Sequence, residues 1–135
     1  MILVDTSVWI RALARREPWA SELDRLLARD WVVRHDFVYG ELLAGDMGGR
    51  VQFLAVYERM RDAGAIPHNE VVVLAKARRL HGRGAGWADI HLLASALAAG
   101  FQLWTADTAL TELANELGIA YRPSGPESKP HLVRK

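Results

Sequence analysis

The chain begins Met1-Ile2-Leu3-Val4-Asp5-Thr6-Ser7, an apolar run that ends abruptly in an acid and two hydroxyl side chains. Residues 2–4 are too few for a helix, so the run predicts a short buried strand. Ser7 is predicted to cap a helix that follows directly. Asp5 would then lie at the carboxyl end of a central strand, where open α/β sheets place their ligand crevices. We therefore expect functional residues from later parts of the chain to converge on Asp5.

Short apolar strands and amphipathic helices alternate along the rest of the chain. After the first strand, further strands are predicted at 31–33, 65–67, 101–105 and 119–121, with helices between them. This alternation is typical of a parallel sheet with helices on both faces, so we predict a three-layer α/β/α fold of about five strands. No repeat or linker interrupts the pattern. We predict one domain over residues 1–122, followed by a mobile tail over residues 123–135, which contain three prolines.

The composition suits a globular protein, because 50% of the 135 residues are hydrophobic and 24% are charged. The net charge of +1 does not favour nucleic acid by itself, but 14 Arg stand against 3 Lys. The forked Arg side chain suits phosphate, although codon bias predicts the same excess. The sequence has no Cys, which excludes disulfides, thiolate metal sites and a Cys nucleophile. The start lacks a cationic segment and residues 92–101 are too few to span a bilayer, so we expect a soluble cytoplasmic protein.

Four acidic residues are predicted where helices and strands meet. Two follow strands, one opens a helix, and one lies about a turn inside another helix. Right-handed crossovers bring the carboxyl ends of parallel strands to one edge of the sheet, so the four carboxylates should gather there. They would repel one another unless cations neutralised them, and Mg²⁺ or Mn²⁺ could also promote phosphodiester hydrolysis. The acids are Asp5, Asp107, Asp89 and Glu41, and Ser7 and Thr105 are candidate hydroxyls for positioning a water or a phosphate oxygen.

Each acid also has a purely structural interpretation. Asp often serves as a helix N-cap, which would explain Asp89 and Asp107. Glu41 would suit a solvated helix face. Asp5 is the hardest to explain this way, because an acid at the end of a buried strand costs free energy without a partner. The order and the junction positions of the four acids together favour a functional site.

A basic cluster precedes Asp89 and consists of Arg78, Arg79 and Arg83, with His81 among them. It could steer a polyanion such as RNA toward the acids, or it could be a solvated helix end that complements the helix dipole. The five Trp are interpreted as core or interface residues rather than base-stacking platforms. His91 lies two positions after Asp89, so we predict it on another helix face and do not propose it as a ligand.

Taken in order, these motifs resemble the PIN-domain ribonucleases. The resemblance runs from Met1 to about Tyr121 and rests on Asp5-Thr6-Ser7, Glu41, the segment 89–96, and Thr105-Ala106-Asp107. The small size resembles the VapC-type toxins of bacterial and archaeal toxin–antitoxin pairs. The resemblance implies a five-stranded parallel sheet and Mg²⁺- or Mn²⁺-dependent endoribonuclease activity. It also implies that all four acids are catalytic and that Asp5 and Asp89 are the direct metal ligands.

The same resemblance implies partners. It predicts a homodimer and a cognate antitoxin that binds over the active-site groove. The helix predicted from Val51 falls where such toxins contact their partners, and its apolar residues spread over more than one face. One position departs from the family: Leu110 stands where many members have an aromatic residue, which we interpret as a packing change.

Two other functions are compatible with parts of the sequence. A haloacid-dehalogenase-type phosphatase would use Asp5 as its nucleophile, but such enzymes usually have a second Asp two residues later, where this chain has Ser7. Lys76 is also the only Lys before the tail. A non-catalytic nucleic-acid-binding module would use the Arg clusters, but a protein that only binds polyanions gains nothing from four gathered acids.

Overall fold

The computed structural model describes residues 1–45 and 51–123. Within these ranges the chain forms three strands and seven helices, most of them joined by short connections. The predicted tail lies outside the described residues from position 124 onward. In chain order the elements are β1 (Ile2–Val4), α1 (Thr6–Leu13), α2 (Trp19–Ala28), β2 (Val32–Val33), α3 (Asp36–Ala44), α4 (Val51–Glu58), α5 (His68–Ala77), α6 (Trp87–Ala99), β3 (Gln102–Trp104) and α7 (Thr108–Glu116).

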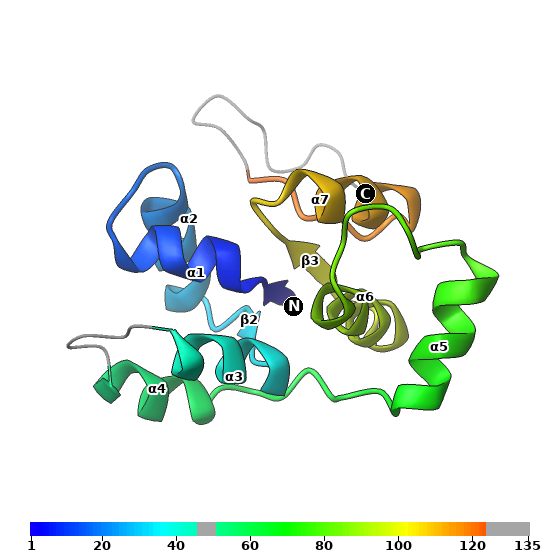
Figure 1. Cartoon of the computed structure of the whole chain (residues 1–135). Helices are drawn as coiled ribbons and strands as arrows, with labels where there is room; N and C mark the ends of the chain where they lie inside the picture. Colours follow the sequence, from blue (N-terminus) through cyan, green and yellow to red (C-terminus); the bar gives the residue numbers. More distant parts are fainter. Residues whose placement is uncertain (46–50, 124–135) are drawn as a thin grey trace.

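The first strand is the centre of a parallel sheet with the order β2-β1-β3. Figure 1 shows the sheet in the middle of the molecule, with α1 and α2 on one side and α6 on the other. Leu3 and Val4 are fully buried, as expected for a parallel sheet that helices cover on both faces. The predicted α/β fold with a parallel sheet is therefore confirmed.

The prediction of about five strands was wrong for the described residues, which contain three. Two further segments each contribute a single parallel bridge, one between Arg34 and Asp62 and one between Leu103 and Ala120. The outer segment on the β3 side lies where a strand was predicted, at 119–121. On the β2 side the bridge lies before the predicted segment 65–67, which ends in a Pro that cannot donate a backbone hydrogen bond. Both outer segments leave the sheet after one bridged residue.

Several helices begin earlier than the sequence suggested. Asp5, not Ser7, is the N-cap of α1, and Ser7 uses its hydroxyl for another contact. His35 is the N-cap of α3, because its ring nitrogen accepts the backbone N–H of Phe37. Helix α6 begins at Trp87, so Asp89 occupies its third position. These shifts change which side chains cap the helices but keep the four acids at junctions.

The core lies where the two helical layers meet the sheet. Trp9 of α1 is buried against Phe53 and Tyr57 of α4, with ring centroids 5.0 and 5.5 Å away. Burying a large apolar side chain contributes about 1.5–3 kcal/mol, so this cluster holds α1 and α4 together. Leu110 is also fully buried, in keeping with a packing role. No helix in the described ranges is long and apolar enough to span a membrane.

Candidate active site

Asp5 is a buried acid at the end of the central strand. Its side chain is 4% exposed, and its backbone N–H donates to the carbonyl of Trp104 at 2.9 Å. That bond fixes the ends of β1 and β3 together, so the position of Asp5 follows from the sheet register. A buried carboxylate needs polar partners, and those partners come from both strand ends.

Two hydroxyl groups hold the carboxylate of Asp5. Ser7 Oγ and Thr105 Oγ1 both donate to Asp5 Oδ2, at 2.7 and 2.8 Å. Each hydroxyl oxygen also accepts a backbone N–H at 3.0 Å, from Ala106 and Asp107 respectively. Because each hydroxyl oxygen accepts a backbone N–H, its own proton points at Asp5 and does not point at a substrate phosphate. Ser7 and Thr105 were expected to position a water or a phosphate oxygen, whereas the contacts described here position Asp5.

Asp89 and Asp107 are both fixed at helix starts. Asp107 is the N-cap of α7, and its Oδ2 accepts the backbone N–H of Leu110 at 2.9 Å. Asp89 Oδ2 accepts the N–H of Gly86, the N-cap of α6, at 3.0 Å. The structural interpretation of these acids as caps is therefore correct in part. In each carboxylate the capping bond uses one oxygen, which leaves the other for the groove.

Glu41 lies on α3 and accepts a hydrogen bond from the hydroxyl of Thr6. Thr6 was not singled out from the sequence, although it lies between Asp5 and Ser7. Its hydroxyl links the first turn of α1 to α3 and sets the orientation of the Glu41 side chain. A hydroxyl residue directly after the strand-end acid was the signal that could have identified it.

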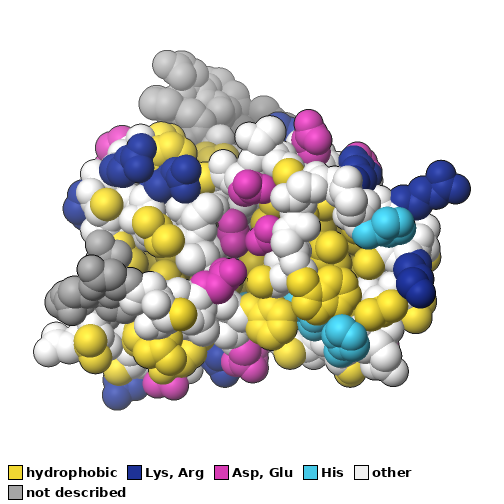
Figure 2. All heavy atoms as spheres, viewed as in Figure 1, with side chains coloured by type: hydrophobic (Ala, Val, Ile, Leu, Met, Phe, Trp, Pro, Cys, Tyr) yellow, Lys and Arg dark blue, Asp and Glu magenta, His cyan; other side chains and the backbone are white. Residues whose placement is uncertain are grey.

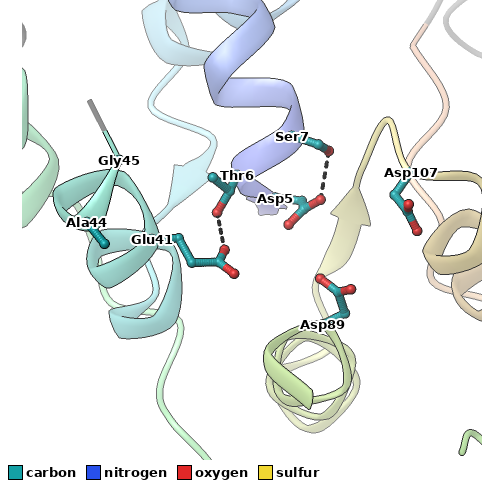
Figure 3. A pocket seen from close by; sticks show the side chains of 8 residues that line it. All are labelled: Asp5, Thr6, Ser7, Glu41, Ala44, Gly45, Asp89 and Asp107. Atoms are coloured by element: carbon teal, nitrogen blue, oxygen red, sulfur yellow. Dashed lines mark hydrogen bonds between the residues drawn. The ribbon is translucent and has the colours of Figure 1, made fainter. Parts of the chain in front are cut away.

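The four acids line one open groove of about 520 Å³. Figure 3 shows their side chains approaching from four different elements, with Asp5 in the middle. In Figure 2 acidic side chains form a row across this face of the molecule. The complete lining is Asp5, Thr6, Ser7, Glu41, Ala44, Gly45, Asp89 and Asp107.

The electrostatics of the groove reflect this crowding. Burial raises the pKa of Asp89, and the nearby carboxyls of Asp5, Glu41 and Asp107 raise it further, while the N–H of Gly86 lowers it. Like charges disfavour ionisation of a neighbour, so the groove is destabilised when all four acids are charged. A cation in the groove would relieve this repulsion.

The donor set fits a hard divalent cation. The four acids offer only oxygen, the ligand atom that Mg²⁺ and Mn²⁺ prefer. Oδ1 of Asp5 accepts no hydrogen bond within the described part of the chain and so remains available. No three acid or His side chains of the described residues form a ready cage for an ion. Mg²⁺ does not require such a cage, because it keeps several waters and binds through one or two carboxylates.

The basic cluster is placed apart from the lining of the groove. Arg78 and Arg79 are exposed at the end of α5. Arg83 is engaged with Glu116 of α7, with a contact of 2.9 Å between Nη1 and Oε1. An exposed ion pair of this kind contributes little to stability, so Arg83 remains free to exchange its partner.

His91 and the Trp residues differ in burial. His91 is buried away from the groove lining, as predicted. Trp9 and Trp104 are buried in the core, as predicted, but Trp31 and Trp87 are 42% and 39% exposed. The sequence did not distinguish these exposed Trp residues from those of the core.

Comparisons with known proteins agree with the geometry. The family model of the PIN domain matches residues 2–116. Two curated relatives are named Ribonuclease VapC32, from Mycobacterium tuberculosis strains CDC 1551 / Oshkosh and ATCC 25618 / H37Rv. Each is 40% identical over 121 residues, which cover 89% of this chain and 95% of the relative.

Proposed function

The chain belongs to the PIN domain family, and from this premise we propose that it is a divalent-metal-dependent endoribonuclease. The observation that carries the proposal is the convergence of four carboxylates from separate elements on one open groove. A protein that only bound RNA would have a lower affinity for it with so many negative charges gathered in one groove. The similarity to a ribonuclease over nearly the whole chain supports the same conclusion.

Asp5 and Asp89 are the proposed metal ligands, and Glu41 and Asp107 complete the acidic set. Mg²⁺ or Mn²⁺ held there supplies Lewis-acid stabilisation of the charge that develops on the phosphoryl oxygens. Ser7 and Thr105 keep the Asp5 carboxylate in one orientation through their bonds to Oδ2. Thr6 does the same for Glu41. The open groove lets a strand of RNA pass across the acids without a separate opening step.

RNA contacts outside the acids are part of the proposal. Arg78 and Arg79 are exposed, and we assign them, with Arg83, to the RNA backbone. A bound phosphate would compete with Glu116 for Arg83. Such contacts would favour RNA association without reading its sequence.

The biological role that we propose is that of the toxin of a type II toxin–antitoxin pair, acting in the cytoplasm. Two observations support this role: the curated relatives are named Ribonuclease VapC32, and the similarity covers 89% of this chain and 95% of each relative. The proposed partners are a second copy of the chain and a cognate antitoxin. Helix α4 supports a partner contact, because Val51 and Val56 are 67% and 55% exposed while Leu54 and Tyr57 are buried.

The test is cleavage of total RNA by the purified protein in Mg²⁺, in Mn²⁺ and in EDTA. We expect discrete fragments that need the metal and that disappear in Asp89→Asn. The matched control is Asp24→Asn, which removes the same charge from an exposed acid on α2, and it should cleave as well as wild type. Cleavage that survives both EDTA and Asp89→Asn would show that the activity does not come from the groove.

A second result would also contradict the proposal. If mass spectrometry shows the protein alone and RNA stays intact in every lane, the endoribonuclease assignment fails. A phosphoryl group trapped on Asp5 would instead identify a phosphatase.

A further inference from the structure

An aromatic and histidine-rich surface lies where α3, α5 and α6 meet. His91 of α6 contacts Phe37 of α3 and Trp87 of α6, with ring centroids 4.5 and 5.1 Å away. Trp87 in turn contacts His68 of α5 at 5.3 Å. We call these four residues the aromatic patch. Three helices therefore contribute one connected group of rings.

Two rings of the aromatic patch face solvent on a rigid support. Phe37 and Trp87 are 36% and 39% exposed, whereas His91 is only 5% exposed. His91 lies against both and fixes their relative positions. Exposed aromatic rings cost free energy in water, and contiguous exposed apolar side chains often mark a binding site.

His91 is 5% exposed, and its ring nitrogens take part in none of the hydrogen bonds found among the described residues. Each nitrogen of an imidazole ring can donate or accept a hydrogen bond, depending on where the proton lies. These groups can form hydrogen bonds with a polar ligand edge that enters the aromatic patch.

The aromatic patch adjoins the acidic groove. Phe37 lies four residues before Glu41 on α3, which places the two side chains next to each other on one helix face, with Cβ atoms about 5–6 Å apart. Trp87 belongs to the first turn of α6, the same turn that carries Asp89. Figure 2 shows hydrophobic side chains with a histidine beside the row of acids. None of the four patch residues lines the groove, but an RNA strand that crosses Glu41 would pass beside Phe37.

We propose that the aromatic patch is a nucleobase subsite, in which Trp87 and Phe37 stack on an unpaired base of the RNA whose phosphate lies in the acidic groove. The proposal rests on the endoribonuclease function and adds the place where a base of the substrate binds. Bases carry flat apolar faces and polar edges, and aromatic rings bind them without relying on charge. This matters here because the groove itself repels phosphate in the absence of a cation.

The occupant that we favour is a base rather than a protein partner. The position of the patch beside Glu41 and Asp89, its exposed ring faces and the ring nitrogens of His91 match a base attached to a bound phosphate. Protein contact is assigned elsewhere, to the aliphatic Val51 and Val56 of α4. Base stacking on the aromatic patch does not involve Arg78 or Arg79, so its contribution to RNA affinity should not depend on the salt concentration.

The experiment measures RNA binding by fluorescence anisotropy in Mg²⁺, in an Asp89→Asn background that keeps the RNA intact. The probes are short oligo(A), oligo(U) and an abasic ribose-phosphate strand of equal length. Trp87→Ala should weaken oligo(A) binding by about five- to a hundredfold and leave the slope of affinity against salt unchanged. Binding of the abasic strand should not change. Trp87→Phe should restore much of the affinity.

The matched control is Trp31→Ala. Trp31 has a similar exposed fraction, 42%, but it precedes β2 and so lies at the opposite end of the sheet from Asp5. This variant should bind every probe like the parent. Equal losses for both variants, or a loss for the abasic strand as large as for oligo(A), would overturn the subsite.

The remaining outcomes separate the subsite from the function on which it rests. RNA cleavage by wild type together with full oligo(A) affinity in Trp87→Ala would overturn the subsite alone. Unchanged affinity with a shift from dimer to monomer in sedimentation would assign the aromatic patch to contact between copies, and would also overturn it. A wild type that neither binds nor cleaves RNA would overturn the endoribonuclease function and the subsite together.

Discussion

Helices α3 and α6 both contribute side chains to two polar centres. In the first centre the donors and acceptors pair with one another. In the second centre the negative charges have no positive partner among the residues that line it. The first, the histidine network, consists of His35, Tyr57 and Ser95. His35 Nδ1 accepts the N–H of Phe37 at 3.0 Å, so Nε2 carries the proton and donates to Ser95 Oγ at 2.9 Å. The second is the acidic groove, where Glu41 of α3 and Asp89 of α6 face two more acids.

The comparison of the two centres separates polar groups that stabilise the fold from polar groups that take part in the proposed reaction. In the histidine network the backbone N–H of His35 donates to the hydroxyl of Tyr57 at 3.0 Å, and His35 and Ser95 are each 1% exposed. A buried network with paired donors and acceptors stabilises one arrangement of the helices. In the groove, burial and the neighbouring carboxyls raise the pKa of Asp89. We therefore expect substitutions in the network to cost stability and substitutions in the groove to cost activity.

The largest effect is expected from Asp5→Asn. The Asn side chain keeps the shape of Asp5 and an oxygen that can accept from Ser7 and Thr105, but it lacks the charge that holds a cation. We predict that RNA cleavage falls at least about 100-fold, because metal charge stabilisation is worth several kcal/mol. Cleavage rates under Mg²⁺ check this, with circular dichroism as the measure of folding. A variant within tenfold of wild type would remove Asp5 from the reaction.

The next effect concerns stability. His35→Ala leaves the hydroxyl of Ser95 and the N–H of Phe37 without partners and opens a cavity between α3 and α6. We predict a loss of about 2–4 kcal/mol in the free energy of unfolding, measured by urea denaturation. The control is His81→Ala, which changes an exposed His and should cost under about 0.5 kcal/mol. Equal losses for the two variants would mean that the network does not stabilise the fold.

The convergence of the acids was predictable from the sequence because it follows from chain topology. Parallel strands share a carboxyl edge, and Asp5 and Asp107 each come just after a strand. The register of β1 with β3 then places Asp5 and Thr105 within hydrogen-bond distance. The periodicity of apolar residues was enough to find the strands that this argument needs.

Other features depended on contacts that no local pattern records. Asp36 is a better N-cap by residue type than His35, but in the structure Asp36 pairs with Arg34 at 2.9 Å. His35 then caps the helix because Ser95, 60 positions later, fixes its other ring nitrogen. The exposure of Trp87 likewise depends on how α5 packs against α6. Tertiary partners therefore determined these details.

The pH dependence of stability sharpens the comparison. Burial lowers the pKa of His35, and burial and the neighbouring His68 lower the pKa of His91. The folded state favours the neutral rings, so their contribution is complete above the unfolded pKa of 6.5 and is lost as the pH falls below it. We predict that the free energy of unfolding drops between about pH 7 and pH 5. His35→Ala should show a shallower drop across the same urea titrations, and an equal slope would contradict the role of His35.

The smallest predicted effect is a rise in the free energy of unfolding, whereas most substitutions lower it. Because burial and three neighbouring carboxyls raise the pKa of Asp89, its charged form destabilises the fold at neutral pH. Asp89→Asn removes that charge and keeps an oxygen that can accept the N–H of Gly86. In metal-free buffer we predict that the free energy of unfolding rises by about 0–1 kcal/mol. Mg²⁺ should stabilise wild type more than the variant, since only wild type has the full set of ligands. A clear loss of stability in Asp89→Asn would mean that Asp89 serves mainly as a helix cap, and the distinction between the two centres would then fail at this residue.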